Sequence, residues 1–447
     1  QSGPPRVSVE TSYDEVHQTL TLRASQATPA TADQKEKAPL VIPISVGLLD
    51  TEGRDMTLKL ADDNEAAVPQ TTRTLILEDE SDEWVFKNVE CNPVLSLGRG
   101  FSAPVIFDYP YSREELAFLA CHDSDPFNRY EAMQRLAVDG LNTMIDMVEA
   151  GEEPEVNDAW STTFRSVLND DGLSPAFRAA ALQLPDEMTV AMTRAIPRCA
   201  MINPDAVRTA WLSAQAFFGR HLSQDFSSTV LKNFSAADYS PDAVEAGKRA
   251  LKNTALDYWL AGGSAKALLT ARDQFDNSDN LTDRLAALQM VVNSQSPAKV
   301  DVLDAAARLW VSEPLLMNKW FTVQATAVAR ANECPVVDRV RALMASKVFS
   351  IKNPNNVYAL VNAFFTRNPG EFHRADGSGY RFWAETVQAV DKINTHVAAR
   401  LARALDNWRR FDPARAKLMH AALTEVAQNT TLSSGVREVV DKALNCR

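Results

Sequence analysis

The stretch Asn353–Arg400, NPNNVYALVNAFFTRNPGEFHRADGSGYRFWAETVQAVDKINTHVAAR, decides the fold class of the long C-terminal part of this chain. Its apolar residues recur at the three-to-four-residue spacing of amphipathic helices. The first helix is predicted to begin at Asn353-Pro354, where a capping residue precedes a proline at the first helical position. A second helix is expected after a glycine-bearing turn at residues 376–380, and a third from about Thr395.

The same helical pattern extends from residue 112 to the end of the chain. Capping residues followed by proline predict helix starts at Asp125-Pro126, Ser174-Pro175, Asn203-Pro204, Ser240-Pro241, Ser296-Pro297, Asn353-Pro354 and Asp412-Pro413. The segments recur every few tens of residues without a strict repeat length. We therefore predict a mainly α protein, in which residues 111–447 form an irregular α-helical solenoid of stacked antiparallel helices.

Residues 1–110 show a different periodicity, in which apolar and polar residues alternate. Alternation of this kind is typical of strands with one buried face. Short runs separated by turn residues are found at Val7–Val9, Leu20–Leu22, Ile42–Leu48, Thr74–Leu77, Trp84–Val89 and Val105–Phe107. We predict a small Ig-like β-sandwich over residues 1–110, although the Cys…Trp…Cys pattern of antibody domains is missing.

Composition excludes several classes of function. The 447 residues carry a net charge of −12, which argues against a nucleic-acid surface. No apolar run approaches the roughly 20 residues that a membrane span requires. The five cysteines are far apart and form no Cys-x-x-Cys pair, so we expect neither a zinc knuckle nor a disulfide framework, and a cytoplasmic location. Because the first residue is Gln1, we expect the chain to be the C-terminal part of a longer protein.

The sequence lacks the motifs of a catalytic centre. None of the six histidines belongs to a His-Glu-x-x-His motif, and no Gly-x-Ser-x-Gly elbow or phosphate-binding loop occurs. Gly377 and Gly379 are interpreted as part of a turn between helices, and His373 as a packing or capping residue. We therefore predict no catalytic residue and no metal site in this chain.

One polar pair remains open to two interpretations. His396 and Arg400 are four residues apart, which places them on one face of the third helix. They could form an ordinary solvated face, or they could line a cavity in which the guanidinium binds a carboxylate through two hydrogen bonds.

Three stretches of the sequence resemble a known family. They are Gln26–Gln34 leading into Pro39–Pro43, then Leu97–Val105, and finally Asn318–Phe321 with Gln324-Ala325 followed by the opening stretch. In collinear order over essentially the whole chain, they resemble the C-terminal half of the aminopeptidase N family, the zinc-dependent alanyl aminopeptidases of bacterial and apicomplexan type.

The resemblance implies that the catalytic site lies on polypeptide that precedes this chain. In the family, the third and fourth domains are a β-sandwich and a helical domain, as expected here. The zinc, its two histidine ligands and one glutamate ligand, and the general base lie in an N-terminal catalytic domain. The resemblance thus implies that this chain packs on that domain, shapes and gates a cavity for peptide substrates, and is inactive alone.

The resemblance also suggests which residues line the cavity. Arg400 matches a family arginine that faces the substrate beyond the scissile bond. His396 stands where bacterial relatives usually carry glutamine, and Tyr358 where they carry another cavity-facing arginine. Both departures remove a familiar polar group, and they imply a shift in preference toward less acidic or more aromatic peptide tails.

Two other functions are compatible with the residue pattern alone. A free-standing helical solenoid could bind another protein on its concave face. An independent enzyme with paired carboxylates is the weaker alternative, because the acidic clusters lie beside turns, where charged side chains are usually solvated.

Overall fold

The computed structural model describes residues 3–31, 34–64, 68–196, 200–235, 237–294, 296–329 and 333–445. Cys199, Cys446 and two residues of the first resemblance stretch, Ala32 and Asp33, lie outside these ranges. The chain divides into two compact units. Unit 1 comprises residues 1–139 and 157–183, and unit 2 comprises residues 140–156 and 184–447. The boundary predicted from the sequence, between a β-sandwich at residues 1–110 and a helical solenoid at residues 111–447, stays a prediction.

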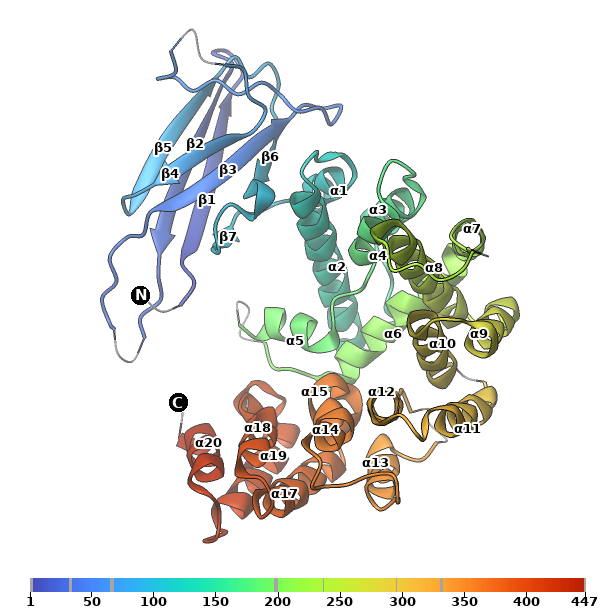
Figure 1. The fold of residues 1–447 in the computed structure, drawn as a ribbon. Helices are drawn as coiled ribbons and strands as arrows, with labels where there is room; N and C mark the ends of the chain where they lie inside the picture. The colour runs from blue at the N-terminus through green and yellow to red at the C-terminus, as the bar shows by residue number, and fades with distance from the viewer. Residues whose placement is uncertain are drawn as a thin grey trace. The chain divides into compact units, whose positions relative to one another are not determined.

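Unit 1 begins with two sheets that pack face to face (Figure 1). One sheet has the strand order β5-β2-β1-β7 and the other has the order β4-β3-β6. All neighbouring strands are antiparallel except β1 and β7, which are parallel. The strands are β1 (Arg6–Asp14), β2 (Thr19–Ala27), β3 (Ile42–Leu49), β4 (Arg73–Leu77), β5 (Ser81–Lys87), β6 (Val94–Leu97) and β7 (Ile106–Asp108).

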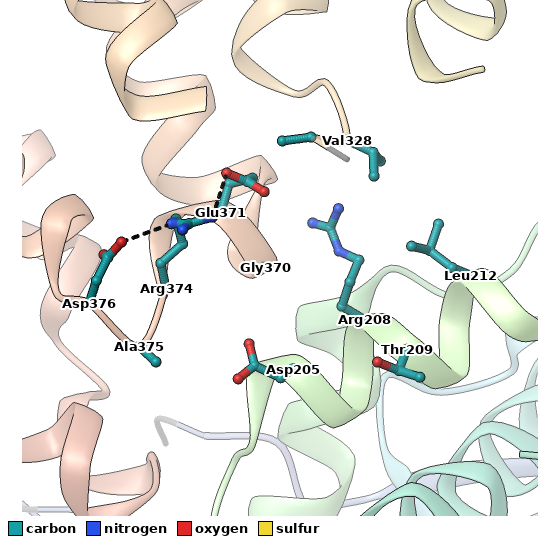
Figure 2. Close-up of a pocket in the computed structure, with 11 residues that line it drawn as sticks. Asp205, Arg208, Thr209, Leu212, Val328, Gly370, Glu371, Arg374, Ala375 and Asp376 are labelled. Atoms are coloured by element: carbon teal, nitrogen blue, oxygen red, sulfur yellow. Dashed lines mark hydrogen bonds and ion pairs between the residues drawn. The ribbon is translucent and has the colours of Figure 1, made fainter. Parts of the chain in front are cut away.

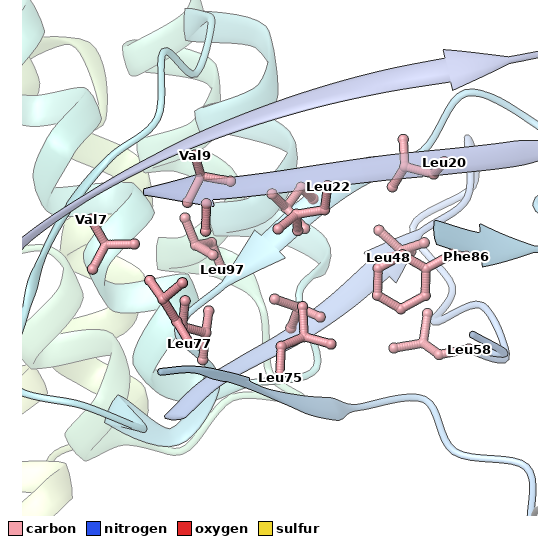
Figure 3. Packing of buried hydrophobic residues seen from close by; sticks show 14 of the residues in the cluster. Val7, Val9, Leu20, Leu22, Leu48, Leu58, Leu75, Leu77, Phe86 and Leu97 are labelled. Carbon is pink, nitrogen blue, oxygen red and sulfur yellow. The ribbon is translucent and has the colours of Figure 1, made fainter. Parts of the chain in front are cut away.

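The sandwich core confirms the alternation read from the sequence. Val7 and Val9 of β1 face Leu75 and Leu77 of β4 across the interior, and these four side chains are at most 2% exposed (Figure 3). Strand β6 was not predicted, because three of its four residues are buried and leave no alternating pattern. It is recognisable only by its pairing with β3.

The guanidinium of Arg99 joins the sandwich to the first helices of unit 1. Arg99 is 4% exposed, and its Nη2 lies 2.6 Å from Asp55 Oδ1 and 3.0 Å from Asp123 Oδ1. Its Nε donates to Ser96 Oγ at 2.8 Å. A Cβ atom at Gly47 would lie 2.0 Å from Arg99 Cζ, so a larger residue at position 47 would displace the arginine.

This contact gives a physical reason for the second resemblance stretch. Gly98 and Gly100 have φ values of 80° and 63°, a region that residues with side chains rarely adopt. The two glycines bend the chain around Arg99. The helices that follow in unit 1 are α1 (Arg113–His122), the first part of α2 (Pro126–Glu149), α3 (Asp158–Asn169) and α4 (Pro175–Ala181).

Helices make up the regular structure of unit 2 in its described part, as the period of its apolar residues predicted. After the end of α2 it contains α5 (Glu187–Ala195), α6 (Pro204–His221), α7 (Ser223–Lys232), α8 (Ala243–Ala261), α9 (Ala265–Asn277), α10 (Leu281–Asn293), α11 (Ala298–Trp310), α12 (Pro314–Ala325), α13 (Val336–Met344), α14 (Pro354–Val357), α15 (Ala363–Arg367), α16 (Pro369–Phe372), α17 (Ser378–Asp391), α18 (Thr395–Ala402), α19 (Pro413–Ala427) and α20 (Ser434–Asn445). A π-helical turn, Tyr358–Asn362, joins α14 to α15.

The first and last parts of this helical array touch each other. Ile202, just before α6, forms a parallel bridge with Phe411, just before α19. Arg415 of α19 is 6% exposed and donates to the Asp205 carboxylate of α6 at 2.5 Å, to the His373 carbonyl at 2.5 Å and to Asp412 at 2.9 Å. We call this junction the seam.

Most of the predicted helix starts are confirmed, but two are displaced. The helix expected at Ser240-Pro241 begins at Ala243, because Asp242 accepts hydrogen bonds from the backbone N–H groups of residues 244 and 245 and so supplies the cap. The helix expected at Ser296-Pro297 begins at Ala298.

The turn expected at residues 376–380 is shorter than predicted. It ends at Gly377, which has a φ of 67°, and α17 begins at Ser378. Gly379 is therefore a helical residue. Glycine is needed at position 379 because a Cβ atom there would lie 2.0 Å from the Phe372 carbonyl oxygen.

Replacing Arg99 by methionine should destabilise unit 1 by about 3–5 kcal/mol, because Asp55 and Asp123 would lose their buried counter-charge. The measurement is the free energy of unfolding from denaturant titration. Arg23→Met is the matched control, since Arg23 forms an exposed pair with Glu83 and its loss should produce no measurable change. Equal effects of the two substitutions would contradict this account of Arg99.

Candidate functional site

Helix α18 presents the predicted polar pair to solvent. The Asn394 side chain caps the helix by accepting a hydrogen bond from Val397 N at 3.1 Å. Val397 and Leu401 are buried, whereas His396 and Arg400 are exposed. His396 and Arg400 therefore lie on one face of a helix, as their spacing predicted, and their role at a cavity stays a prediction.

The structure brings Arg400 and Tyr358 together. Arg400 Cζ lies 5.0 Å from the centre of the Tyr358 ring, which is within the range of a cation–π contact. Tyr358 is partly buried, and its ring lies beneath the longer side chain. Within the described chain, no hydrogen bond or ion pair joins His396 to either residue.

Tyr358 is positioned by the π-helical turn that it begins. Such a turn is wider than α-helix and leaves backbone carbonyl groups without their regular partners. The Ala359 carbonyl is instead bonded by Thr322 Oγ of α12 at 2.9 Å. Helix α12 therefore stabilises the turn from outside.

Asn356 also connects these two segments, and a local hydrogen bond holds it in place. Asn356 Nδ2 donates to Asn318 Oδ1 at 2.8 Å, and Asn356 Oδ1 accepts from Ser350 N at 3.0 Å. Asn356 is 7% exposed, so these bonds are largely shielded from water. The Asn318 and Asn353 segments of the resemblance are thus in direct contact, and together they fix the segment that carries Tyr358.

The arrangement leaves Arg400 chemically available. Its cation rests on the ring face of Tyr358, and no acidic side chain of the described residues pairs with it. The N–H groups at the edge of the guanidinium therefore remain free to donate to a ligand. A guanidinium held by stacking in this way is suited to bidentate binding of a carboxylate.

His373 is buried and is confirmed as a packing residue. Its side chain is 4% exposed, its Nδ1 lies 3.1 Å from Tyr380 Oη, and its ring centre lies 4.3 Å from that of Phe411. Burial, reinforced by the nearby Arg415 cation, lowers the pKa of His373 to about 3. The imidazole is therefore neutral at physiological pH.

A cavity of about 510 Å³ lies at the seam and was not found from the sequence. We call it the seam cavity. It is lined by Asp205, Arg208, Thr209, Leu212, Val328, Ala329, Gly370, Glu371, Arg374, Ala375 and Asp376 (Figure 2). The α6 residues follow the i, i+3, i+4, i+7 spacing of one helix face, which is the only local signal that could have indicated them.

Neither a metal-binding group of side chains nor a membrane-spanning helix is found in the described ranges. No group of three or more His, Cys, Asp and Glu side chains in the described ranges is placed to hold a metal ion. None of the described helices combines the length and apolar character needed to span a bilayer.

Two family models match the chain. Residues 3–110 match a domain described as "Domain of unknown function (DUF3458) Ig-like fold". Residues 113–445 match one described as "Domain of unknown function (DUF3458_C) ARM repeats". The chain therefore belongs to the family of these ARM-repeat domains, which agrees with its helical solenoid.

Three relatives that match the chain are named aminopeptidase N. The protein from Escherichia coli (strain K12) is 33% identical over 444 residues, covering 99% of this chain and 49% of that protein. The protein from Caulobacter vibrioides is 33% identical over 445 residues, and that from Haemophilus influenzae is 31% identical over 444 residues. The chain spans about half the length of these curated relatives, with 49% covered in each.

A solved structure shows the same architecture. The crystal structure of Legionella pneumophila aminopeptidase A in complex with aspartic acid matches with a TM-score of 0.82 and 26% identity, covering 99% of this chain and 49% of that one. The resemblance to the C-terminal half of aminopeptidase N is thus confirmed.

Acidification should destabilise unit 2 through His373. The unfolded histidine binds a proton near pH 6.5, whereas the folded one resists protonation down to a pKa of about 3. Stability should therefore fall as the pH drops from about 6.5 toward 3, by at most about 1.4 kcal/mol per pH unit. His373→Phe should flatten the pH dependence of the unfolding free energy, and an unchanged slope would contradict the assignment. The control is His420→Phe, at an exposed position of α19.

Proposed function

We propose that this chain is the non-catalytic C-terminal portion of a zinc-dependent aminopeptidase that removes N-terminal amino acids from peptides. In this proposal, the helical domain packs on the catalytic domain of the parent protein and shapes and gates the cavity that admits the substrate. The observation that supports it most directly is the similarity to aminopeptidase N over 99% of the chain, with 31–33% identity to three relatives.

The chemistry of this chain is consistent with an accessory part. Hydrolysis of a peptide requires a polarised carbonyl and an activated water, which a zinc ion with an open coordination position supplies. The proposal assigns that ion and its ligands to polypeptide other than this chain. The sparse cysteines also lead us to propose a cytoplasmic location for the parent protein.

Arg400 is the residue of this chain that we propose meets the substrate. The scissile bond lies near the free amine of the peptide, so a cation at a distance from it would meet the carboxylate end of a short substrate. Tyr358 acts as a positioning residue, because its ring carries the guanidinium at 5.0 Å. His396, four residues earlier on the same exposed face, completes the polar lining.

Arg400→Ala in the parent enzyme should raise KM for short peptides by about tenfold or more, the loss expected for a charge-assisted hydrogen bond. Single-residue substrates without a distal carboxylate should be almost unaffected. Steady-state kinetics with a tripeptide and an aminoacyl anilide would measure both effects. An equal rise in KM for the two substrates would argue against carboxylate binding.

Two matched variants sharpen the test. Arg403→Ala removes an exposed arginine on the next turn, which pairs with Asp406 at 3.1 Å, and should leave both substrates unchanged. Tyr358→Leu keeps Arg400 but removes its ring platform, and should cause a smaller rise in KM for peptides alone.

The metal dependence of the parent protein is tested by chelation. Treatment with 1,10-phenanthroline should abolish release of N-terminal residues, and added zinc should restore it. Activity that persists after complete removal of zinc would exclude the proposed mechanism.

A further inference from the structure

The seam cavity has a charged lining with fixed geometry. Arg208 is held at its Nε by Glu187 at 2.8 Å and at its Nη2 by Asn368 Oδ1 at 2.9 Å. Asn368 is 1% exposed and is itself fixed by hydrogen bonds to the carbonyl groups of Ala325 and Ala327, both 2.9 Å long. Arg208 therefore cannot swing freely.

The fixed arginine points one side of its guanidinium into the cavity. Figure 2 shows the Arg208 head group in the open space between α6 and the segment that carries Glu371. In the described structure, its Nη1 has no hydrogen-bonding partner. Gly370 leaves room for the arginine itself, since a Cβ atom there would lie 2.6 Å from Arg208 Nε.

An opposite charge lies one helical turn away. Asp205 precedes Arg208 by three residues on the same face of α6, and its side chain is 64% exposed. Although residues at this spacing often pair, no ion pair joins these two among the described residues. Asp205 is bonded to Arg415 and Arg208 to Glu187. Their separate partners hold the two charges apart at the edge of the cavity.

The wall of the cavity that faces α6 also carries charges of both signs. Arg374 lies 3.2 Å from Asp376 and 3.8 Å from Glu371, and Glu371 also accepts a hydrogen bond from Val336 N at 3.2 Å. A ligand with a single negative charge would be attracted by two arginines but repelled by three carboxylates. A ligand with a single positive charge would meet the reverse conflict. A ligand that carries both charges can place each charge beside side chains of the opposite sign.

We propose that the seam cavity binds a small zwitterion of the α-amino acid class. The carboxylate of the ligand accepts hydrogen bonds from Arg208, and its ammonium group donates to Asp205. An aliphatic side chain lies against Leu212 and Val328, the apolar part of the lining. A volume of about 510 Å³ is within the range of small-molecule sites.

This inference goes beyond the proposed function and does not depend on it. The cavity is built only from unit 2, and it lies between segments about 160 residues apart in the chain, as the Arg208–Asn368 bond shows. A ligand that contacts both sides binds the folded seam but not the unfolded chain. It should therefore raise the melting temperature of the protein.

Calorimetric titration of the full-length protein with L-leucine tests the proposal. Two analogues test the two charges: 4-methylpentanoate lacks the ammonium group, and 3-methylbutylamine lacks the carboxylate. Each analogue should bind about tenfold or more weakly than leucine, because one charge-assisted contact is lost. Equally tight binding of 4-methylpentanoate would show a simple anion site and would overturn the proposal.

Substitutions separate this cavity from any other leucine site in the protein. Ala375 is exposed and lines the cavity, so Ala375→Trp should fill it and remove one leucine site. Ala421→Trp, at an exposed position of α19 outside the lining, should retain that site. Binding that is unchanged in Ala375→Trp would place the leucine elsewhere and overturn the proposal.

The role of the arginines is tested by conservative changes. Arg208→Lys keeps the charge beside Glu187 but loses the planar head group, and should weaken leucine binding about tenfold. If Arg208→Lys fails to fold, Arg374→Gln provides the second test. It removes the other arginine that attracts the ligand carboxylate, and the side chain it replaces is 35% exposed, with Asp376 and Glu371 as its partners. A folded Arg208→Lys or Arg374→Gln protein with full affinity would contradict the assignment.

Discussion

The buried guanidinium of Arg415 is the contact on which the arrangement of unit 2 depends. In an open solenoid, each helical pair touches only its neighbours, and the ends are free to move apart. Here one arginine bonds the Asp205 carboxylate, the His373 carbonyl and Asp412, and so joins segments 210 residues apart. Burying this cation is costly unless it is fully paired. One acceptor at each of its three nitrogens offsets that cost and makes the closed arrangement specific.

The sequence predicted the parts of the fold that are determined locally. In strands with one buried face, apolar and polar residues alternate. Helix starts are recognisable where a capping residue precedes a proline, as at Asn203 and Asn353. It failed where a residue further along supplied the cap, as Asp242 does, and where a strand is buried on both sides, as β6 is. The seam could not be predicted, since ion pairs between distant residues leave no periodic pattern.

In the candidate site, too, the locally determined features were predictable and the contacts between distant residues were not. Helical periodicity was enough to place His396 and Arg400 on one face of a helix. The contact of Arg400 with Tyr358 spans 42 residues of sequence, and only the family resemblance brought the two residues into one hypothesis. The residues that support Tyr358 were invisible, because Thr322 and Asn318 act through hydrogen bonds to another helix. The family resemblance included their segment but gave no indication that it holds Tyr358 in position.

The π-helical turn at Tyr358–Asn362 has a consequence for how such proteins diversify. A turn of this kind contains one more residue than the regular helix around it. Loss of one codon there would restore regular helix and rotate everything before it by about 100°. Tyr358 would then leave Arg400, while the apolar contacts of α15 stayed in register. Length variation at this point, more than exchange of side chains, can therefore change which side chains meet on the exposed face of α18.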